Sequence, residues 1–175
     1  MQLTRYTDYA LRVLMYVGLH TGRMVTIAEV ADVFGMSHNH LMKVVQELSA
    51  QGYVKSTRGK NGGIELGRAP GAINIGEVVR HMESNFYVVE CLDPERSLCR
   101  IIPGCTLKKA LQEAVSAFQE VLNRYTLADL LKNHAALHRL LTERREVKTS
   151  DRVTRRAVKS EGRTVSKNND AKNRS

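Results

Sequence analysis

The sequence predicts a mainly α-helical chain that carries one small β-hairpin. Apolar residues recur at intervals of three and four through most of residues 1–141, which is the period of an amphipathic helix. One short segment instead alternates polar and apolar residues on both sides of an Asn-Gly pair, as hairpins do. The final stretch, 142–175, contains no Leu, Ile or Phe and is rich in Lys and Arg, so we expect it to be a disordered basic tail.

The first three helices are expected within residues 4–52. The first covers 4–20. The second begins at Thr26, where Thr26 and Glu29 form a capping-box pattern. It ends at Gly35, which can adopt the left-handed conformation that stops a helix. The third begins at Ser37, and two short helices joined by such a tight turn are the helix-turn-helix pattern.

This helix-turn-helix, Ala28 to Gln51, is a candidate DNA-binding unit. The N-terminal half of its second helix would enter the major groove, where amide, imidazole and ammonium groups can contact base edges or phosphates. The candidate contact residues are Ser37, His38, Asn39, His40, Lys43 and Gln46. An ordinary polar helix face would have the same composition, so the helix pair alone does not decide the function.

The hairpin that follows favours DNA binding. The segment "YVKSTRGKNGGIELGR" reads as strand, turn and strand, and it is basic. A helix-turn-helix followed by a basic hairpin is a winged helix, whose wing lies along the DNA backbone or reaches the minor groove. The predicted wing residues are Arg58, Lys60, Asn61, Gly62 and Gly63. The glycines lack the spacing of a nucleotide-binding loop.

Three more helices are expected after the hairpin. Asn74 begins the first of them, and a long amphipathic helix covers 106–125. Its apolar stripe is wide enough to pack on a partner chain, so we expect a homodimer, although a helix within the chain's own core would look similar. A last helix is expected over 127–141.

The predicted architecture is therefore a winged helix-turn-helix plus a long dimerisation helix. The predicted parts are the DNA-binding domain 1–82, the cysteine loop with the dimerisation helices 83–141, and the tail 142–175.

All three cysteines, Cys91, Cys99 and Cys105, lie in the segment "CLDPERSLCRIIPGC". The sequence shows no signal peptide and no transmembrane segment, which indicates a reducing cytoplasmic location where stable disulfides are rare. Clustered thiols in that compartment indicate a metal or redox site. The spacing favours an iron–sulfur cluster with a fourth ligand from elsewhere, while zinc and a thiol-oxidation switch stay open as alternatives.

The sequence does not indicate an enzyme. It contains no pairing of a nucleophile with a base, no phosphate-cradling loop after a strand and no paired acidic metal site.

The opening "TDYALR", the "RGKNGG" wing and "CRIIPGC" occur in an order that resembles a family of winged-helix iron–sulfur transcriptional regulators, and in particular its nitric-oxide-sensitive repressors. The resemblance covers about residues 1–141. It implies a homodimer that binds a double-stranded DNA operator and represses nitrosative-stress genes until nitric oxide attacks its cluster. Cys91, Cys99 and Cys105 would hold the cluster, with [2Fe-2S] preferred and [4Fe-4S] possible.

The resemblance also implies a fourth ligand, and this sequence departs from the family pattern in two places. The matching acidic position is Asp8, which would act from the partner subunit. The spacing between Cys91 and Cys99 is longer than is usual in the family, and Lys108 stands where some members have a histidine ligand. The alternative function is a winged-helix regulator that senses thiol oxidation, zinc or cluster supply.

Overall fold

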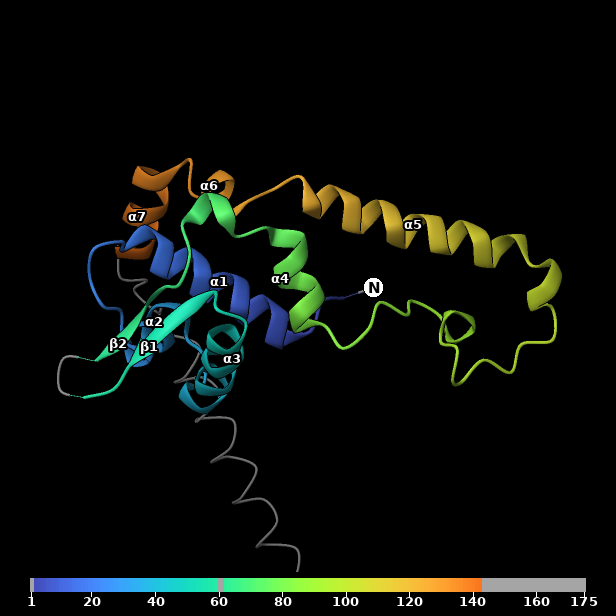
Figure 1. The fold of residues 1–175 in the computed structure, drawn as a ribbon, viewed down its shortest axis with the longest axis horizontal. Coiled ribbons are helices and arrows are strands. Elements are labelled where there is room, and N and C mark those ends of the chain that lie inside the picture. Colours follow the sequence, from blue (N-terminus) through green and yellow to red (C-terminus); the bar gives the residue numbers. More distant parts are fainter. Residues whose placement is uncertain (1, 60–61, 143–175) are drawn as a thin grey trace, which may run out of the picture. The chain divides into compact units, whose positions relative to one another are not determined.

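The computed structural model describes residues 2–59 and 62–142. The elements follow in the order α1 (Arg5–Leu19), α2 (Ile27–Phe34), α3 (His38–Ala50), β1 (Val54–Thr57), β2 (Gly63–Leu66), the 3-10 turn η1 (Pro70–Ala72), α4 (Ile75–Met82), the 3-10 turns η2 (Glu90–Leu92) and η3 (Ile102–Gly104), α5 (Thr106–Asn123), α6 (Leu127–Leu130) and α7 (His134–Thr142). Figure 1 shows the helices and the single hairpin of the described residues. The predicted class, mainly helical with one small hairpin, is confirmed.

Helix α1 supplies the centre of the core. Ala10, Val13, Leu14 and Val17 recur at helical spacing, and each is at most 1% exposed. They pack in one cluster with apolar side chains of α2, α3, the hairpin and α4. Thr4 caps the helix by accepting a hydrogen bond from the Thr7 amide, because the first amides of a helix have no partner within it. The winged-helix part therefore has a continuous apolar core built around one helix.

The helix-turn-helix forms where the sequence predicted it. Thr26 accepts a hydrogen bond from the Glu29 amide at the start of α2, and Gly35 ends that helix with φ 64°, in the left-handed region. Two details differ from the prediction. The Glu29 carboxylate binds Tyr16 and Arg23 instead of closing the capping box, and Ser37 stands at the N-cap of α3 without a side-chain capping bond.

The hairpin is fixed to the body of the protein by a third backbone segment. β1 and β2 pair antiparallel with Val54 opposite Leu66 and Thr57 opposite Gly63. Val25 exchanges both backbone hydrogen bonds with Ile64, at 3.0 and 2.7 Å. A side chain at Gly63 would lie 2.7 Å from the Val25 carbonyl, so glycine is required for this close approach. Lys60 and Asn61, two predicted wing residues, lie outside the described residues.

A polar joint connects α4 to the C-terminal end of α5. Asn74 Nδ2 donates to the Asn123 carbonyl at 2.7 Å, and Arg80 Nη1 donates to Asn123 Oδ1 at 2.6 Å. The Ile75 amide donates to the Tyr125 carbonyl at 3.0 Å. In Figure 1, α4 accordingly lies beside the end of α5 that leads to α6.

The stretch between α4 and α6 contributes no buried residue. Every residue from 83 to 126 is described, and each is at least partly exposed, whereas Met82 before the stretch and Leu127 after it are buried. Residues 83–126 therefore form an excursion whose two ends are held by the core. We call this stretch the excursion below.

The last helix differs from the prediction. The sequence predicts one helix over 127–141, and the structure divides it into α6 and α7. Thr126 and Asp129 form a capping box at α6, which ends at Leu130 with Leu131 as its C-cap. The break allows α7 to turn back onto α1, where a ring nitrogen of His134 lies 3.1 Å from the Leu19 carbonyl oxygen. The division at residue 82 stays a prediction, and the predicted tail lies outside the described residues apart from Thr142.

Candidate DNA interface and cysteine loop

The recognition surface is the exposed side of α3. Leu41, Val44, Val45 and Leu48 bury one side of the helix in the core. The six predicted contact residues, Ser37, His38, Asn39, His40, Lys43 and Gln46, are all exposed. The structure therefore leaves all six candidate residues accessible on the surface, while their contact with DNA stays a prediction.

The position of α3 is fixed from α1. The Tyr6 hydroxyl donates to the Lys43 carbonyl at 2.9 Å, halfway along the exposed side. Burial, together with the nearby Glu47 carboxylate, raises the pKa of Tyr6, so this hydroxyl keeps its proton at neutral pH. Lys43 forms no ion pair with any described residue. Its charge is therefore available to a phosphate or to a base edge.

The described part of the wing presents one cation on a tight turn. Arg58 is exposed, and it forms no ion pair with the described part of the chain. The Gly62 amide donates to the Gly59 carbonyl at 2.9 Å, and Gly59 has φ 116°. A side chain at Gly62 would meet the Thr57 carbonyl at 2.2 Å. Gly62 and Gly63 are thus needed for the shape of the wing. Because glycine has no side chain, any side-chain contact between the wing and DNA must come from other wing residues, such as Arg58.

The three cysteines share the excursion. Cys91 lies in η2 and is half-buried, Cys99 is exposed, and Cys105 is the N-cap of α5, where its Sγ accepts a hydrogen bond from the Lys108 amide at 3.4 Å. All three are free thiols. Within residues 2–59 and 62–142, no three His, Cys, Asp or Glu side chains gather closely enough to hold a metal ion.

The donor set nevertheless suits an iron–sulfur cluster chemically. Three free thiols, one exposed and two on half-buried residues, lie in a segment whose only regular structure is two 3-10 turns. Ser97 Oγ, between Cys91 and Cys99, is shielded from solvent and has no hydrogen-bond partner among the described residues. A shielded hydroxyl gains stability from a hydrogen-bond partner, which a bound water molecule or a bound group would supply here.

Asp8, the predicted fourth ligand, lies in the first turn of α1. Its carboxylate pairs with Arg12 at 2.9 Å, and the side chain is 43% exposed. The structure does not bring Asp8 together with the three thiols of the same chain within a metal-holding group. The sequence interpretation did not pair Arg12 with Asp8, although a basic residue four positions after Asp8 is the ordinary spacing of a helical ion pair.

These features define a class of protein. A helix-turn-helix with an exposed recognition helix, a basic wing and a core separate from the cysteine loop is the fold of a winged-helix DNA-binding regulator.

Comparison with known proteins identifies the family. The sequence profile of Rrf2, described as an iron-dependent transcriptional regulator, matches residues 3–133. The HTH-type transcriptional regulator NsrR of Bacillus licheniformis is 48% identical over 143 residues, which cover 81% of this chain and 100% of that protein. NsrR of Bacillus subtilis is 49% identical over 142 residues, covering 81% of this chain and 97% of its own. This chain belongs to the Rrf2 family.

Solved structures agree with this assignment. IscR of T. potens is similar with a TM-score of 0.61 and 25% identity, over 76% of this chain and 88% of that one. CymR, the global cysteine regulator of B. subtilis, is similar with a TM-score of 0.59 and 27% identity, over 74% of this chain and 95% of its own. The predicted resemblance is confirmed at the level of the family and of the NsrR relatives.

The relatives also settle the broad function. They are named as transcriptional regulators, so this chain is a transcriptional regulator and not an enzyme. None of the described helices is long and apolar enough to cross a membrane.

Proposed function

We propose that this protein is a homodimeric repressor that binds a double-stranded DNA operator while its cysteine loop holds an iron–sulfur cluster, and that nitric oxide releases it from the DNA. The genes it controls would be those of the nitrosative-stress response, in the cytoplasm. The observation that carries this proposal is the pair of separate parts in one chain: a well-packed winged helix, and an unburied loop with three free thiols.

Cys91, Cys99 and Cys105 would hold the cluster, with [2Fe-2S] preferred over [4Fe-4S]. A bound cluster with an incomplete thiolate set supplies iron that nitric oxide can attack. The chain's own part is to keep the thiols accessible, since they lie in a loop without buried residues. Asp8 of the partner subunit is the proposed fourth ligand. To bind the cluster, its carboxylate would have to share or give up its ion pair with Arg12.

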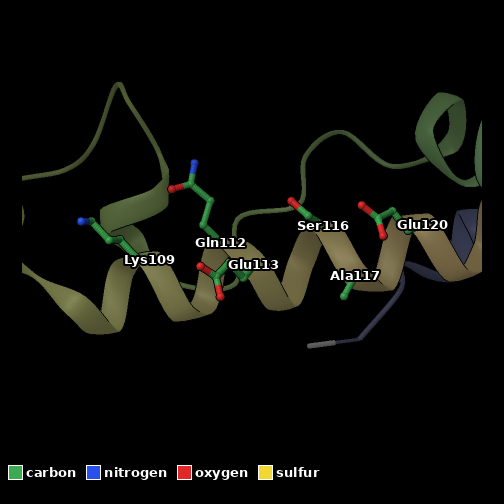
Figure 2. Close-up of a pocket in the computed structure, with 6 residues that line it drawn as sticks. All are labelled: Lys109, Gln112, Glu113, Ser116, Ala117 and Glu120. Atoms are coloured by element: carbon green, nitrogen blue, oxygen red, sulfur yellow. The ribbon is translucent and has the colours of Figure 1, made fainter.

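A dimer is supported by α5. Its apolar stripe contains Leu107, which is 65% exposed, and Val121, which is 46% exposed, and no residue of the helix is buried. The opposite side is polar. Figure 2 shows six side chains along it, all from α5: Lys109, Gln112, Glu113, Ser116, Ala117 and Glu120. An exposed apolar stripe opposite a polar one is typical of a helix that packs against another chain.

The test is an anaerobic titration of the full-length protein. We would record the visible spectrum with the iron and sulfide content, select duplexes from a random-sequence pool, and add nitric oxide while DNA binding is followed at one fixed salt concentration. We expect a coloured protein that loses its visible absorption and its DNA affinity together. A colourless, sulfide-free protein that binds DNA and does not respond to nitric oxide would contradict the proposal.

The thiols are tested by single substitutions. Cys91→Ala, Cys99→Ala and Cys105→Ala should each lose the cluster and specific DNA affinity and keep the circular dichroism of a folded protein. Leu98→Ala is the matched control, because Leu98 is the neighbour of Cys99, is 88% exposed and has no donor atom. It should keep the cluster. Retention of nitric-oxide-sensitive binding by all three cysteine variants would refute the ligand set.

The alternative function is a regulator that responds to thiol oxidation or to zinc. It is favoured by one observation, the exposed and free Cys99 thiol. In that case the purified protein would contain no sulfide, and either zinc removal or a mild oxidant would change its DNA affinity in place of nitric oxide.

A further inference from the structure

Met42 is an unusual residue on the recognition helix. Its side chain is 46% exposed. Among the described residues before position 83, it is the only large hydrophobic side chain in the exposed class, because all others there are buried or partly buried. The described part of the winged helix therefore buries, at least in part, all its large apolar side chains except Met42, which is exposed to solvent on α3.

The position of Met42 puts it among the candidate DNA contacts. Asn39, Met42, Lys43 and Gln46 stand at helical spacings of three and four, so they share one side of α3. All four are exposed, and the opposite side of the helix is buried in the core. Of the four, only Met42 can neither donate a hydrogen bond nor carry a charge.

The chemistry of the major groove limits what an apolar side chain can contact there. Phosphates and base edges offer charges, donors and acceptors, which suit Asn39, Lys43 and Gln46. The one apolar group that an unmodified base edge presents in the major groove is the C5-methyl group of thymine. A flexible thioether side chain can adjust to reach such a group, and the contact removes apolar surface of both partners from water.

We propose that Met42 is a specificity-determining residue that contacts a thymine methyl group in the major groove. The inference rests on the proposed DNA-binding function and deepens it, because it names the base and the atom that one side chain recognises. The neighbouring Lys43 contributes positive charge instead. Its contribution to DNA affinity should therefore not depend on the thymine methyl group.

The experiment removes the methyl group and nothing else. Full-length wild-type protein, purified anaerobically, selects duplexes from a random-sequence pool. Each thymine of a selected duplex is then replaced in turn by deoxyuridine, and affinity is measured by fluorescence anisotropy at one fixed salt concentration. At one or more defined thymines, we expect the replacement to weaken wild-type binding about fourfold, as for one buried methyl group.

Two variants then assign the effect to Met42. Met42→Ala and Met42→Gln should bind the thymine and deoxyuridine duplexes equally well at that position, so the fourfold ratio falls to about one. Lys43→Ala is the matched control. It should bind both duplexes more weakly, keep the ratio, and lower the dependence of affinity on salt. Circular dichroism checks that all variants are folded.

The outcomes separate this inference from the proposed function. If the wild-type protein selects no duplex, the DNA-binding function itself fails. If it selects a duplex in which no thymine methyl group affects affinity, or if both Met42 variants keep the fourfold ratio, the inference about Met42 is wrong.

Discussion

Glu29 shows how one side chain joins two elements of the DNA-binding body. Its carboxylate accepts hydrogen bonds from Tyr16 at 2.8 Å and from Arg23 at 3.0 Å. The Arg23 guanidinium, ahead of the Tyr16 hydroxyl, lowers the pKa of Glu29 from 4.5 to about 2 against the effect of burial. Burial and the Glu29 carboxylate raise the pKa of Tyr16 to about 12, so this hydroxyl stays a donor throughout the neutral range. The network fixes the start of α2 against the end of α1.

The first prediction concerns the pH dependence of stability. Because the pKa of Glu29 is lower in the folded protein, acid favours the unfolded chain. The stabilisation from this carboxylate is present above about pH 4.5 and is lost as the pH falls toward 2. We expect Glu29→Gln to destabilise the protein by about 1 kcal/mol near neutral pH, since Arg23 is exposed and solvent screens the pair.

The measurement is the thermal midpoint of wild type and variant across that pH range. The two curves should converge below pH 4.5. Glu113→Gln, at an exposed carboxylate without an ion pair among the described residues, is the control and should follow the wild type. A constant difference between Glu29→Gln and wild type down to pH 2 would show that the charge of Glu29 is not the source of its contribution.

At the scale of elements, the joint between α4 and α5 depends on a glycine. A side chain at Gly76 would lie 2.0 Å from Asn123 Oδ1 and 3.0 Å from the Asn123 amide nitrogen. Asn123 cannot easily move aside, because Arg80 and Asn74 both hold it. The close approach of the two helices therefore requires glycine at this position.

Gly76→Ala should displace the end of α5 from α4. We expect a loss of about 1–3 kcal/mol in the free energy of unfolding, as for other overpacked contacts. Urea denaturation followed by circular dichroism measures it. Gly71→Ala is the matched control, because a side chain there meets nothing within 4 Å, and it should change stability by no more than about 0.5 kcal/mol. Equal effects of the two substitutions would mean that α4 and α5 tolerate a wider separation.

The elements also show which sequence signals are reliable. Thr26 and Asn74 begin helices as predicted, and Gly35 ends one, because each of these signals acts within a single turn of the chain. The division of 127–141 into α6 and α7 was missed, because it depends on contact with Leu19, far away in the sequence. The bond between Tyr53 and His81, at 2.7 Å, is another contact that no local pattern indicates.

At the scale of the whole molecule, the two sides of α5 make the dimer testable. Ala114 lies in the apolar stripe and Ala117 on the polar side of Figure 2, and both are exposed. Ala114→Asp should weaken the dimer at least tenfold, because burying an unpaired carboxylate between two chains is costly. Ala117→Asp should leave the dimer intact. Analytical ultracentrifugation over a concentration series distinguishes the two, and a monomeric wild type, or equal behaviour of both variants, would contradict dimerisation through this stripe.

The candidate site could be predicted only in part from the sequence, because part of it depends on how distant segments are arranged in the whole molecule. The exposed side of α3 follows from its apolar spacing, since the core fixes the opposite side. The spacing of the cysteines indicates a shared ligand, but spacing alone does not show where Cys91, Cys99 and Cys105 lie relative to one another. That arrangement depends on the path of a segment that no buried side chain holds.

The loop of residues 83–105, which joins α4 to α5, has a consequence for the spacing of its cysteines. The entropy lost when a flexible segment is closed between two fixed ends grows only with the logarithm of its length, by about 0.6 kcal/mol for each doubling. A few residues added between Cys91 and Cys99 lengthen the loop of residues 83–105 by a small fraction, so they cost the folded protein almost nothing. The stability of the fold therefore places almost no constraint on this spacing, which is left free to match the proposed cluster.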